Sequence, residues 1–305
     1  MDERFLQAAA LLPTHLRREA EQLPGERQTL AEELRLRVGR PLTVLYPDGE
    51  ATIPGCKDTP ITACHLTQVM EIATQASVHT VLDRVCSGFV TVRGGHRVGI
   101  CGSCVTKEGQ VTNLRQISSL AIRIARAVPG AAAQVLPALL ERGRLSSTLL
   151  LSPPGLGKTT LLRDLIRSVS EGEGTVPLRV GVADERGELA AMYDGAPQLD
   201  LGRRTDVVDG CPKATGLLML LRGMNPQVLA ADEITAPEDC GALCMAANCG
   251  VALLATAHGE SLVDLKQRPL YRSLLEQNIF RRVVTIERVS GQRRYRVAEQ
   301  SGAKC

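Results

Sequence analysis

Residues 147–167, STLLLSPPGLGKTTLLRDLIR, decide the fold of this chain. The apolar run STLLLS is typical of a buried strand, and KTTLLRDLIRSVS has the amphipathic spacing of a helix. Between them lies the glycine-rich turn PPGLG. A strand, a glycine-rich turn and a helix in this order gather backbone N–H groups and a helix N-terminus around one point, and that arrangement binds phosphate.

The turn matches the phosphate-loop pattern G-x-x-x-x-G-K-S/T except at its first position, which is Ser152. Ser152 stands at the strand exit, where a small residue is needed more than glycine itself. Gly155 and Gly157 let the backbone wrap the phosphates without a Cβ in the way. Lys158 is expected to reach the β and γ phosphates of ATP, and the Thr159 hydroxyl to ligate Mg²⁺. The residues predicted to contact the nucleotide are Pro154, Gly155, Leu156, Gly157, Lys158, Thr159 and Thr160.

A second apolar strand, PQVLAADEI, ends in Asp232 and Glu233. A carboxylate at the end of a strand in this position can hold Mg²⁺, so Asp232 is predicted as a metal ligand. Glu233 is one residue further along and is predicted to polarise the attacking water as the general base. Acidic pairs after strands also occur by chance, but this one follows the loop with one strand between, as a Walker B element does.

Polar residues follow two further strands. VALLATAH ends at His258, which is predicted to touch the γ-phosphate or its water; a capped loop residue is the alternative. VADERGEL places Asp184, Glu185 and Glu188 after another strand, at the ligand edge of a parallel sheet. Glu185 or Glu188 is predicted to assist water activation, although acids at a helix N-terminus would also explain them.

Charge that develops on the γ-phosphate needs a cation beyond Lys158. The candidates are Arg203 and Arg204, with Arg222, Arg123 and Arg126 as further possibilities. We expect any such arginine to come from a neighbouring subunit or from the N-terminal half of the chain. Surface ion pairing is the alternative for each of them.

The composition of the 305 residues is that of a globular protein, with 44% hydrophobic and 23% charged residues. A net charge of +3 and 2% aromatic residues provide neither a strong basic field nor stacking platforms for single strands, so nucleic acid is not the expected partner. No apolar run reaches the roughly 18 residues that span a bilayer. The N-terminal segment MDERFLQAAALLPTHLRREAEQLP is predicted to form an amphipathic helix and not a signal peptide. These features predict a cytoplasmic protein without a direct membrane span.

The chain is predicted to have two domains, 1–127 and 128–305, with residues 128–130 as the boundary. The first is expected to be a small α+β domain, with a hairpin turning at residues 47–49, a helix over about 62–85, and strands joined by Gly94 and Gly95. The second alternates helices with short apolar strands, which predicts an α/β fold: a RecA-like P-loop NTPase domain around a parallel sheet. Its last strands are expected to form a solvated hairpin about Ser290 and Gly291.

The ten cysteines include one C-x-x-C, Cys101 and Cys104. No second pair follows at a spacing suited to structural zinc, so reduced thiols are expected. Helical spacing predicts that Cys240, Cys244 and Cys249 serve packing.

The run LRGMNPQVLAADEITAPEDCGALCMAANCGVALLATAHGE resembles the secretion-type ATPases of type II and type IV systems. Over most of its length the chain also resembles the stage III AA sporulation proteins of endospore-forming bacteria, through ELRLRVGRPL, ADERGELA and RTDVVDGCPKATGLLMLLRGMNPQVLAADEI. The resemblance implies a mother-cell ATPase that forms a hexameric ring. It also implies membrane-protein partners in the channel complex between mother cell and forespore, and supports roles for Glu233 and His258. ITAPED lacks the Arg-Asp pair usual in the secretion enzymes, and their tetracysteine zinc module is missing.

Two other functions share such a catalytic core. One is a RecA-type nucleic-acid motor or helicase, which ATPase stimulation by single-stranded DNA would favour. The other is a transporter-type nucleotide-binding subunit, but its Ser-Gly-Gly-Gln element is replaced here by LLRGMNPQ.

Overall fold

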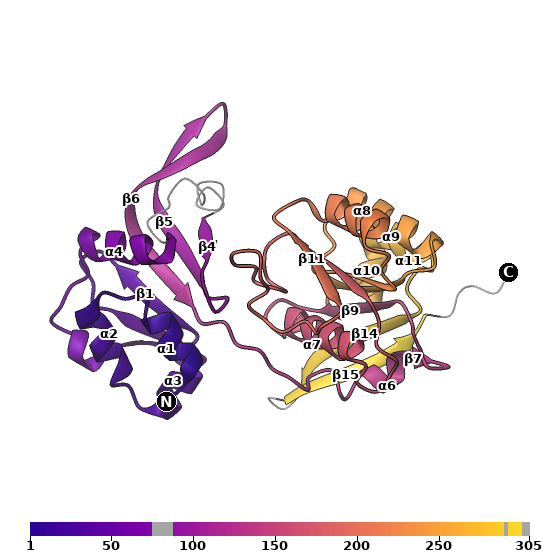
Figure 1. Cartoon of the computed structure of the whole chain (residues 1–305), viewed down its shortest axis with the longest axis horizontal. Coiled ribbons are helices and arrows are strands. Elements are labelled where there is room, and N and C mark those ends of the chain that lie inside the picture. The colour runs from indigo at the N-terminus through magenta and orange to yellow at the C-terminus, as the bar shows by residue number, and fades with distance from the viewer. Residues whose placement is uncertain (75–87, 290–291, 301–305) are drawn as a thin grey trace. The chain divides into compact units, whose positions relative to one another are not determined.

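The computed structural model of the chain describes residues 1–74, 88–289 and 292–300 (Figure 1). The chain forms two compact units: the first comprises Met1–Arg126 and Ala191–Gln198, and the second Ala127–Ala190 and Leu199–Cys305. A short segment of the C-terminal half, Ala191–Gln198, therefore belongs to the N-terminal unit, where the Gln198 side chain accepts a hydrogen bond from Gly94 N at 2.8 Å. No sequence pattern had indicated this excursion.

The first unit is a six-stranded antiparallel sheet with helices on one face. Its strands lie in the order β3-β2-β1-β6-β5-β4. They are β1 (Glu33–Arg37), β2 (Thr43–Tyr46), β3 (Gly49–Thr52), β4 (Phe89–Thr91), β5 (Arg97–Lys107) and β6 (Gln110–Arg123). The helical segments are α1 (Glu3–Ala9), α2 (Thr14–Glu21), α3 (Gly25–Leu30), the 3-10 turn η1 (Pro54–Cys56) and α4 (Ala63–Thr74).

The alternation of β1 explains why one face of this sheet is covered. Leu34 and Leu36 are fully buried against the helices, together with Phe5 of α1, whereas Glu33, Arg35 and Arg37 point to the other face. The predicted hairpin is present, because β2 and β3 pair across the turn at residues 47–48. The distal part of the β5–β6 ribbon extends beyond the neighbouring strands (Figure 1).

Two expectations for this unit need revision. The N-terminal segment is not one helix, because Pro13 and Pro24 each stand at the N-cap of a new helix and cannot continue the preceding one. The predicted helix over 62–85 is present as α4, whereas its continuation beyond Thr74 lies outside the described residues.

The second unit is a three-layer α/β structure around a seven-stranded sheet of order β11-β10-β12-β13-β9-β14-β15. Its strands are β9 (Thr148–Ser152), β10 (Val180–Asp184), β11 (Thr205–Asp209), β12 (Val228–Ala231), β13 (Ala252–His258), β14 (Arg282–Val289) and β15 (Gln292–Glu299). Its helices are α6 (Leu136–Leu139), α7 (Lys158–Glu171), α8 (Lys213–Gly223), α9 (Pro237–Asn248), α10 (Leu262–Gln267) and α11 (Pro269–Glu276), and β7 (Leu140–Glu141) pairs with β8 (Arg144–Leu145) in a separate small hairpin.

All strands of the large sheet are parallel except β15, which pairs antiparallel with β14. Helix α7 covers one face, and α8, α9 and α11 cover the other (Figure 1). The four predicted strands are present, and β11 is an additional one that sequence analysis missed, because two of the five residues in TDVVD are acids and the strand is only half-buried. The turn of the C-terminal hairpin, Ser290 and Gly291, lies outside the described residues.

This topology assembles the site. β9, β10, β12 and β13 run parallel, so the residues that follow each of them meet at one edge of the sheet. His258, for example, stands directly opposite Ser152 in the register of β13 with β9. The motifs separated by more than a hundred residues in the sequence are thereby neighbours in space.

Candidate nucleotide site

The loop between β9 and α7 adopts the backbone conformation that its glycines were expected to allow. Gly155 and Gly157 have φ of 78° and 92°, in the left-handed region that other residues rarely adopt. A Cβ at Gly155 would enter open space, so that side of the backbone is accessible to a ligand. Gly157 is the N-cap of α7 and supplies no side-chain cap, which leaves the first N–H groups of the helix for an anion.

Lys158 lies almost fully buried at the centre of the site. Its ammonium donates to Ser152 O at 2.8 Å, to Pro153 O at 3.1 Å and to His258 Nδ1 at 2.9 Å. Burial lowers the pKa of Lys158, and the carboxylates of Asp232 and Glu233 act in the opposite direction.

Ser152 also participates in holding this lysine. Its hydroxyl lies 3.2 Å from Lys158 Nζ and donates to Pro153 O at 2.8 Å. The serine that replaces the first glycine of the pattern is fully buried and adds an acceptor for the lysine.

Asp232 is held between two threonine hydroxyls. Thr159 Oγ1 donates to Asp232 Oδ2 at 2.6 Å, and Thr256 Oγ1 donates to Asp232 Oδ1 at 2.5 Å. A hydroxyl and a carboxylate from the first turn of α7 and the end of β12 are the hard oxygen donors that Mg²⁺ uses beside nucleotide phosphates. The residues present therefore fit a magnesium ion held jointly by protein and nucleotide. Consistent with so few protein ligands, the described residues contain no group of three or more His, Cys, Asp or Glu side chains that could hold a metal alone.

The backbone of Glu233 is held in an unusual conformation. Its φ is 53°, in the left-handed region, which costs a non-glycine residue on the order of 1–2 kcal/mol. Two hydrogen bonds fix it there: Thr256 Oγ1 accepts from Glu233 N at 2.8 Å, and Lys213 Nζ donates to Glu233 O at 2.8 Å. This backbone conformation turns the chain away from the strand direction, so that the Glu233 carboxylate lies in the site.

The Glu233 carboxylate is engaged on both oxygens. Oε1 lies 3.1 Å from His258 Nε2, and Oε2 accepts a hydrogen bond from the Arg186 guanidinium. Since the ammonium of Lys158 can only donate, His258 Nδ1 accepts from it and Nε2 carries the proton that is donated to Glu233. Lys158, His258, Glu233 and Arg186 thus form one continuous chain of hydrogen bonds.

The loop after β10 is built by two buried charges that point inward. Asp184 accepts from the backbone N–H groups of Glu188 and Ala190, each at 2.8 Å; burial raises its pKa, and these hydrogen bonds oppose the rise. Arg163 of α7 donates to the carbonyls of Glu188 and Leu189, and burial lowers its pKa. Asp184 therefore shapes the loop from within.

Lys213 connects this loop with the end of β12. Its buried ammonium lies 3.1 Å from the Glu185 carboxylate and 3.6 Å from that of Asp239. Glu185 is thus paired with Lys213, whereas Glu188 contributes its backbone to the loop through Arg163.

The predicted arginines do not gather at this site within one chain. Arg203 pairs with Glu171 at 2.8 Å and Arg204 donates to Ser170 O at 3.1 Å, both at the far end of α7, about 20 Å along the helix from Lys158. Arg222 lies at the C-terminal end of α8. A catalytic role of Arg203 or Arg204 consequently requires a neighbouring subunit and stays a prediction.

The two arginines of the N-terminal unit have partners within that unit. Arg123 lies on the exposed face of the sheet and pairs with Glu33 at 2.9 Å. Arg126 ties together the N-terminal helices, donating to Gln28 O at 2.7 Å and pairing with Asp2 at 3.2 Å.

The structure adds three residues that sequence analysis did not single out: Arg163, Arg186 and Lys213. Arg186 is part of ADERGEL, in which only the acidic residues were predicted to have a role. Lys213 follows Pro212 at the start of a predicted helix, a position that gave no sign of pointing toward Glu233. Arg186 and Lys213 could have been found from their position shortly after a strand. That position indicates a role in the site only when the order of the strands in the sheet is known.

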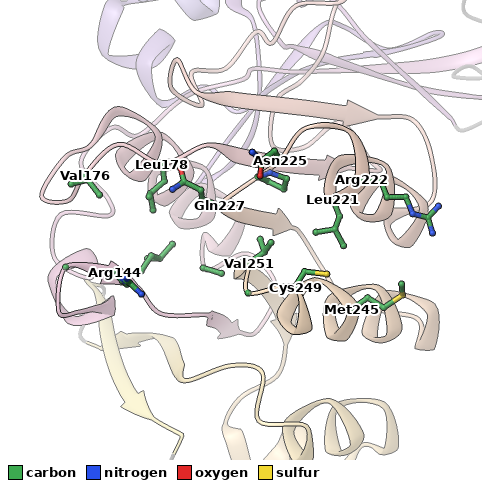
Figure 2. A pocket seen from close by; sticks show the side chains of 15 residues that line it. Arg144, Val176, Leu178, Leu221, Arg222, Asn225, Gln227, Met245, Cys249 and Val251 are labelled. Atoms are coloured by element: carbon green, nitrogen blue, oxygen red, sulfur yellow. The ribbon is translucent and has the colours of Figure 1, made fainter.

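A small cavity lies at the candidate site itself, lined among others by Glu185, Arg186, Lys213, Asp232 and Glu233, and larger cavities lie elsewhere. One of about 780 Å³ lies at the opposite edge of the sheet, where β12 and β13 begin, and includes Arg144, Arg222 and Met245 in its lining (Figure 2). Ligands of parallel α/β sheets bind at the carboxyl ends of the strands, so the candidate nucleotide site is the other edge.

Cys101 and Cys104 both lie on β5 and are exposed. Residues three apart on an extended strand are separated by about 10 Å, which is beyond the reach of a disulfide. Cys240 and Cys244 are half-buried as packing predicts, whereas Cys249 is exposed, because it follows the last residue of α9.

Comparison with known proteins shows the family of this chain. The family model described as Sporulation stage III, protein AA matches residues 2–301. The chain belongs to this family. Within it, the chain is 39% identical over 284 residues to Stage III sporulation protein AA of Bacillus subtilis (strain 168), covering 93% of this chain and 91% of that protein.

Two solved structures share the fold of this chain. The pilus retraction motor PilT with bound ADP superposes with a TM-score of 0.61 at 16% identity, covering 91% of this chain and 82% of that one. The ATPase DotB of Legionella pneumophila superposes with a TM-score of 0.59 at 15% identity, covering 94% of this chain and 80% of that one. At this identity the likeness shows the fold: a RecA-like domain preceded by an N-terminal domain, as predicted.

Among the described residues, no helix combines the length and the apolar character that crossing a bilayer requires.

Proposed function

We propose that this protein is a Mg²⁺-dependent ATPase and that Glu233 is its general base. The observation that carries the proposal is the convergence of Lys158, Thr159, Asp232, Glu233 and His258 at one sheet edge, linked by hydrogen bonds of 2.6–3.1 Å. Each of them provides one component of phosphoryl transfer to water.

The chemistry of the proposal follows from these contacts. The N–H groups at the start of α7 and the Lys158 ammonium bind the β and γ phosphates of ATP. Thr159 and Asp232 would hold Mg²⁺, which would neutralise phosphate charge. Glu233 accepts a proton from the attacking water as its oxygen bonds to the γ-phosphorus and the bond to the bridging oxygen breaks. His258 connects the base to Lys158, so that a change in the phosphates reaches Glu233.

We further propose that hydrolysis serves the assembly or operation of a secretion-like channel complex between mother cell and forespore. Membership of a stage III sporulation family supports the setting. In this proposal the protein works in the mother-cell cytoplasm as a hexameric ring and reaches the membrane through partner proteins. Under this proposal single-stranded DNA leaves the hydrolysis rate unchanged; strong stimulation would favour the nucleic-acid motor instead.

Two substitutions test the catalytic proposal. Lys158→Ala should abolish binding of ATP, because the buried ammonium is removed from the loop. Glu233→Gln should bind ATP with an affinity close to that of the unaltered protein but lower kcat about 100-fold or more. Phosphate release and binding of a fluorescent ATP analogue measure the two effects separately.

Glu238→Gln is the matched control, because Glu238 is an exposed carboxylate in the first turn of α9 outside the site, and it should retain full activity. Undiminished turnover of Glu233→Gln would show that another group is the base.

A further inference from the structure

Arg186 is an exposed cation of the candidate site. Its guanidinium donates to Glu233 Oε2, and its side chain is 55% accessible to solvent. The loop that carries it is fixed from below, because Asp184 accepts from three of its backbone N–H groups and Arg163 holds two of its carbonyls. The position of Arg186 beside the base is therefore set by buried contacts and not by a loose surface loop.

Most other cations of this edge have buried partners, and two exposed arginines contact other parts of it: Arg268 donates to His258 O at 2.9 Å, and Arg293 lies beside Gly157 of the phosphate loop. Lys213 is buried among Glu233 O, Glu185 and Asp239, and Arg163 is buried on backbone carbonyls. Lys158 belongs to the phosphate loop. Among these described cations, Arg186 combines an exposed guanidinium with a direct contact to the predicted base, Glu233.

The chemistry of hydrolysis places the γ-phosphate next to this guanidinium. A water that gives its proton to Glu233 while attacking phosphorus must lie between the carboxylate and the γ-phosphate. A group already bonded to that carboxylate is then adjacent to the oxygens on which negative charge develops. Guanidinium has five donors in a fixed fork, so it can keep one bond to a carboxylate and offer others to a phosphate oxygen.

We propose that Arg186 is a catalytic residue that supplies, from the same chain, the cation that stabilises the transition state of phosphoryl transfer. It exchanges no proton: the water proton goes to Glu233, and Arg186 neutralises charge on the γ-phosphate oxygens. This inference rests on the proposed ATPase function and deepens it. It differs from the sequence-based expectation, which sought such an arginine in a neighbouring subunit or in the N-terminal half.

The test compares Arg186→Ala and Arg186→Lys with Arg281→Ala in the full-length protein. Arg281 is a matched control, since it is an exposed arginine with a carboxylate partner, Glu141 at 3.4 Å, outside the site. Arg186→Ala should lower kcat about 100-fold or more, while KM and the Kd for ADP change by less than about threefold. Arg186→Lys should recover about tenfold of the loss, because it restores the charge without the fork.

A second readout distinguishes transition-state stabilisation from structural support of the loop. ADP with aluminium fluoride mimics the phosphoryl group in transfer. The unaltered protein and Arg281→Ala should retain ADP much longer when aluminium fluoride is present, whereas Arg186→Ala should bind ADP normally and show no such gain.

The outcomes separate the two proposals. If the unaltered protein hydrolyses ATP and Arg186→Ala retains kcat within about twofold, or still gains retention with aluminium fluoride, the role of Arg186 is wrong and the ATPase function stands. If the unaltered protein neither binds nor hydrolyses ATP, the proposed function is overturned, and the role of Arg186 with it.

Discussion

At the scale of single residues, the site depends on one glutamate that its own backbone disfavours. Glu233 has a φ of 53°, and the bonds that hold it come from Thr256 on one side and Lys213 on the other. Strain of this kind persists only where surrounding contacts over-determine the conformation. Lys213 is thus a positioning residue: it fixes the peptide that aims the predicted base, and it balances the buried carboxylate of Asp239 and the exposed one of Glu185.

Replacing Lys213 by methionine tests this arrangement. Lys213→Met should lower the free energy of unfolding by about 3 kcal/mol, because breaking a buried ion pair leaves a carboxylate without its partner. Urea unfolding measures the change, and the same variant should lose kcat because Glu233 O has lost its donor. Lys266→Met, at an exposed lysine of α10, should change stability by less than about 0.5 kcal/mol. Equal stabilities of the two variants would contradict the buried role.

At the scale of elements, α7 links the phosphate loop to the rest of the second unit. It begins at Lys158, which is part of the site, and its core-facing residues from Leu161 to Val169 are buried against the sheet. It ends at Gly172, whose φ of 84° gives the left-handed cap and whose N–H donates to Ser168 O at 3.0 Å. The position of the loop therefore depends on both ends of this helix.

The two glycines after α7 allow a matched comparison. A Cβ at Gly172 would lie 2.7 Å from the Pro177 ring, whereas a Cβ at Gly174, also at positive φ, would meet nothing within 4 Å. Gly174→Ala should cost about 1–2 kcal/mol for the backbone conformation alone. Gly172→Ala should cost about 3 kcal/mol, because a steric clash is added. Urea denaturation of both variants measures the difference, and equal costs would mean that Pro177 gives way freely.

At the scale of the whole molecule, the two units contribute different things. The second unit holds the phosphate loop and the acidic end of β12, whereas the first is an antiparallel sheet with a buried histidine. His96 is fully buried; its Nδ1 accepts from Ala125 N at 3.1 Å, and its Nε2 has no hydrogen-bond partner among the described residues. Burial, with Arg4 and Arg126 nearby, lowers the pKa of His96 to about 4.

This histidine predicts acid sensitivity of the first unit. The pKa of His96 is about 6.5 when unfolded and about 4 when folded, so its contribution to stability is present above pH 6.5 and is lost as pH falls toward 4. The loss should total on the order of 3 kcal/mol. Hydrogen exchange of peptides from β5 and β6 at several pH values reads this unit separately. His96→Gln should make the exchange protection of β5 and β6 depend less on pH. If the pH dependence is the same in this variant, other groups cause the acid sensitivity.

Much of this architecture could be predicted because it depends on local sequence patterns, namely apolar runs and glycine positions. Apolar runs such as 228–231 and 252–258 are strands buried on both faces, and the glycines of 155–157 mark a turn that only such residues adopt readily. Prediction failed where local patterns were weak. The half-buried β11 carries too many acids to resemble a buried strand. Pro13 and Pro24 divide the N-terminal segment into separate helices, although its apolar periodicity predicted a single one.

The parallel α/β class, the phosphate loop and the acidic strand end that follows it could be predicted from sequence, because they depend on neighbours in the chain. The meeting of Arg186 and His258 on Glu233 could not. Nor could the bond from Lys213 to the backbone of Glu233, or the part of Ser152 in holding Lys158. The physical reason is the strand order. Contacts between residues as far apart as Lys158 and His258 arise because parallel strands bring their carboxyl ends to one edge, and side-chain geometry there is set by packing that no short segment contains.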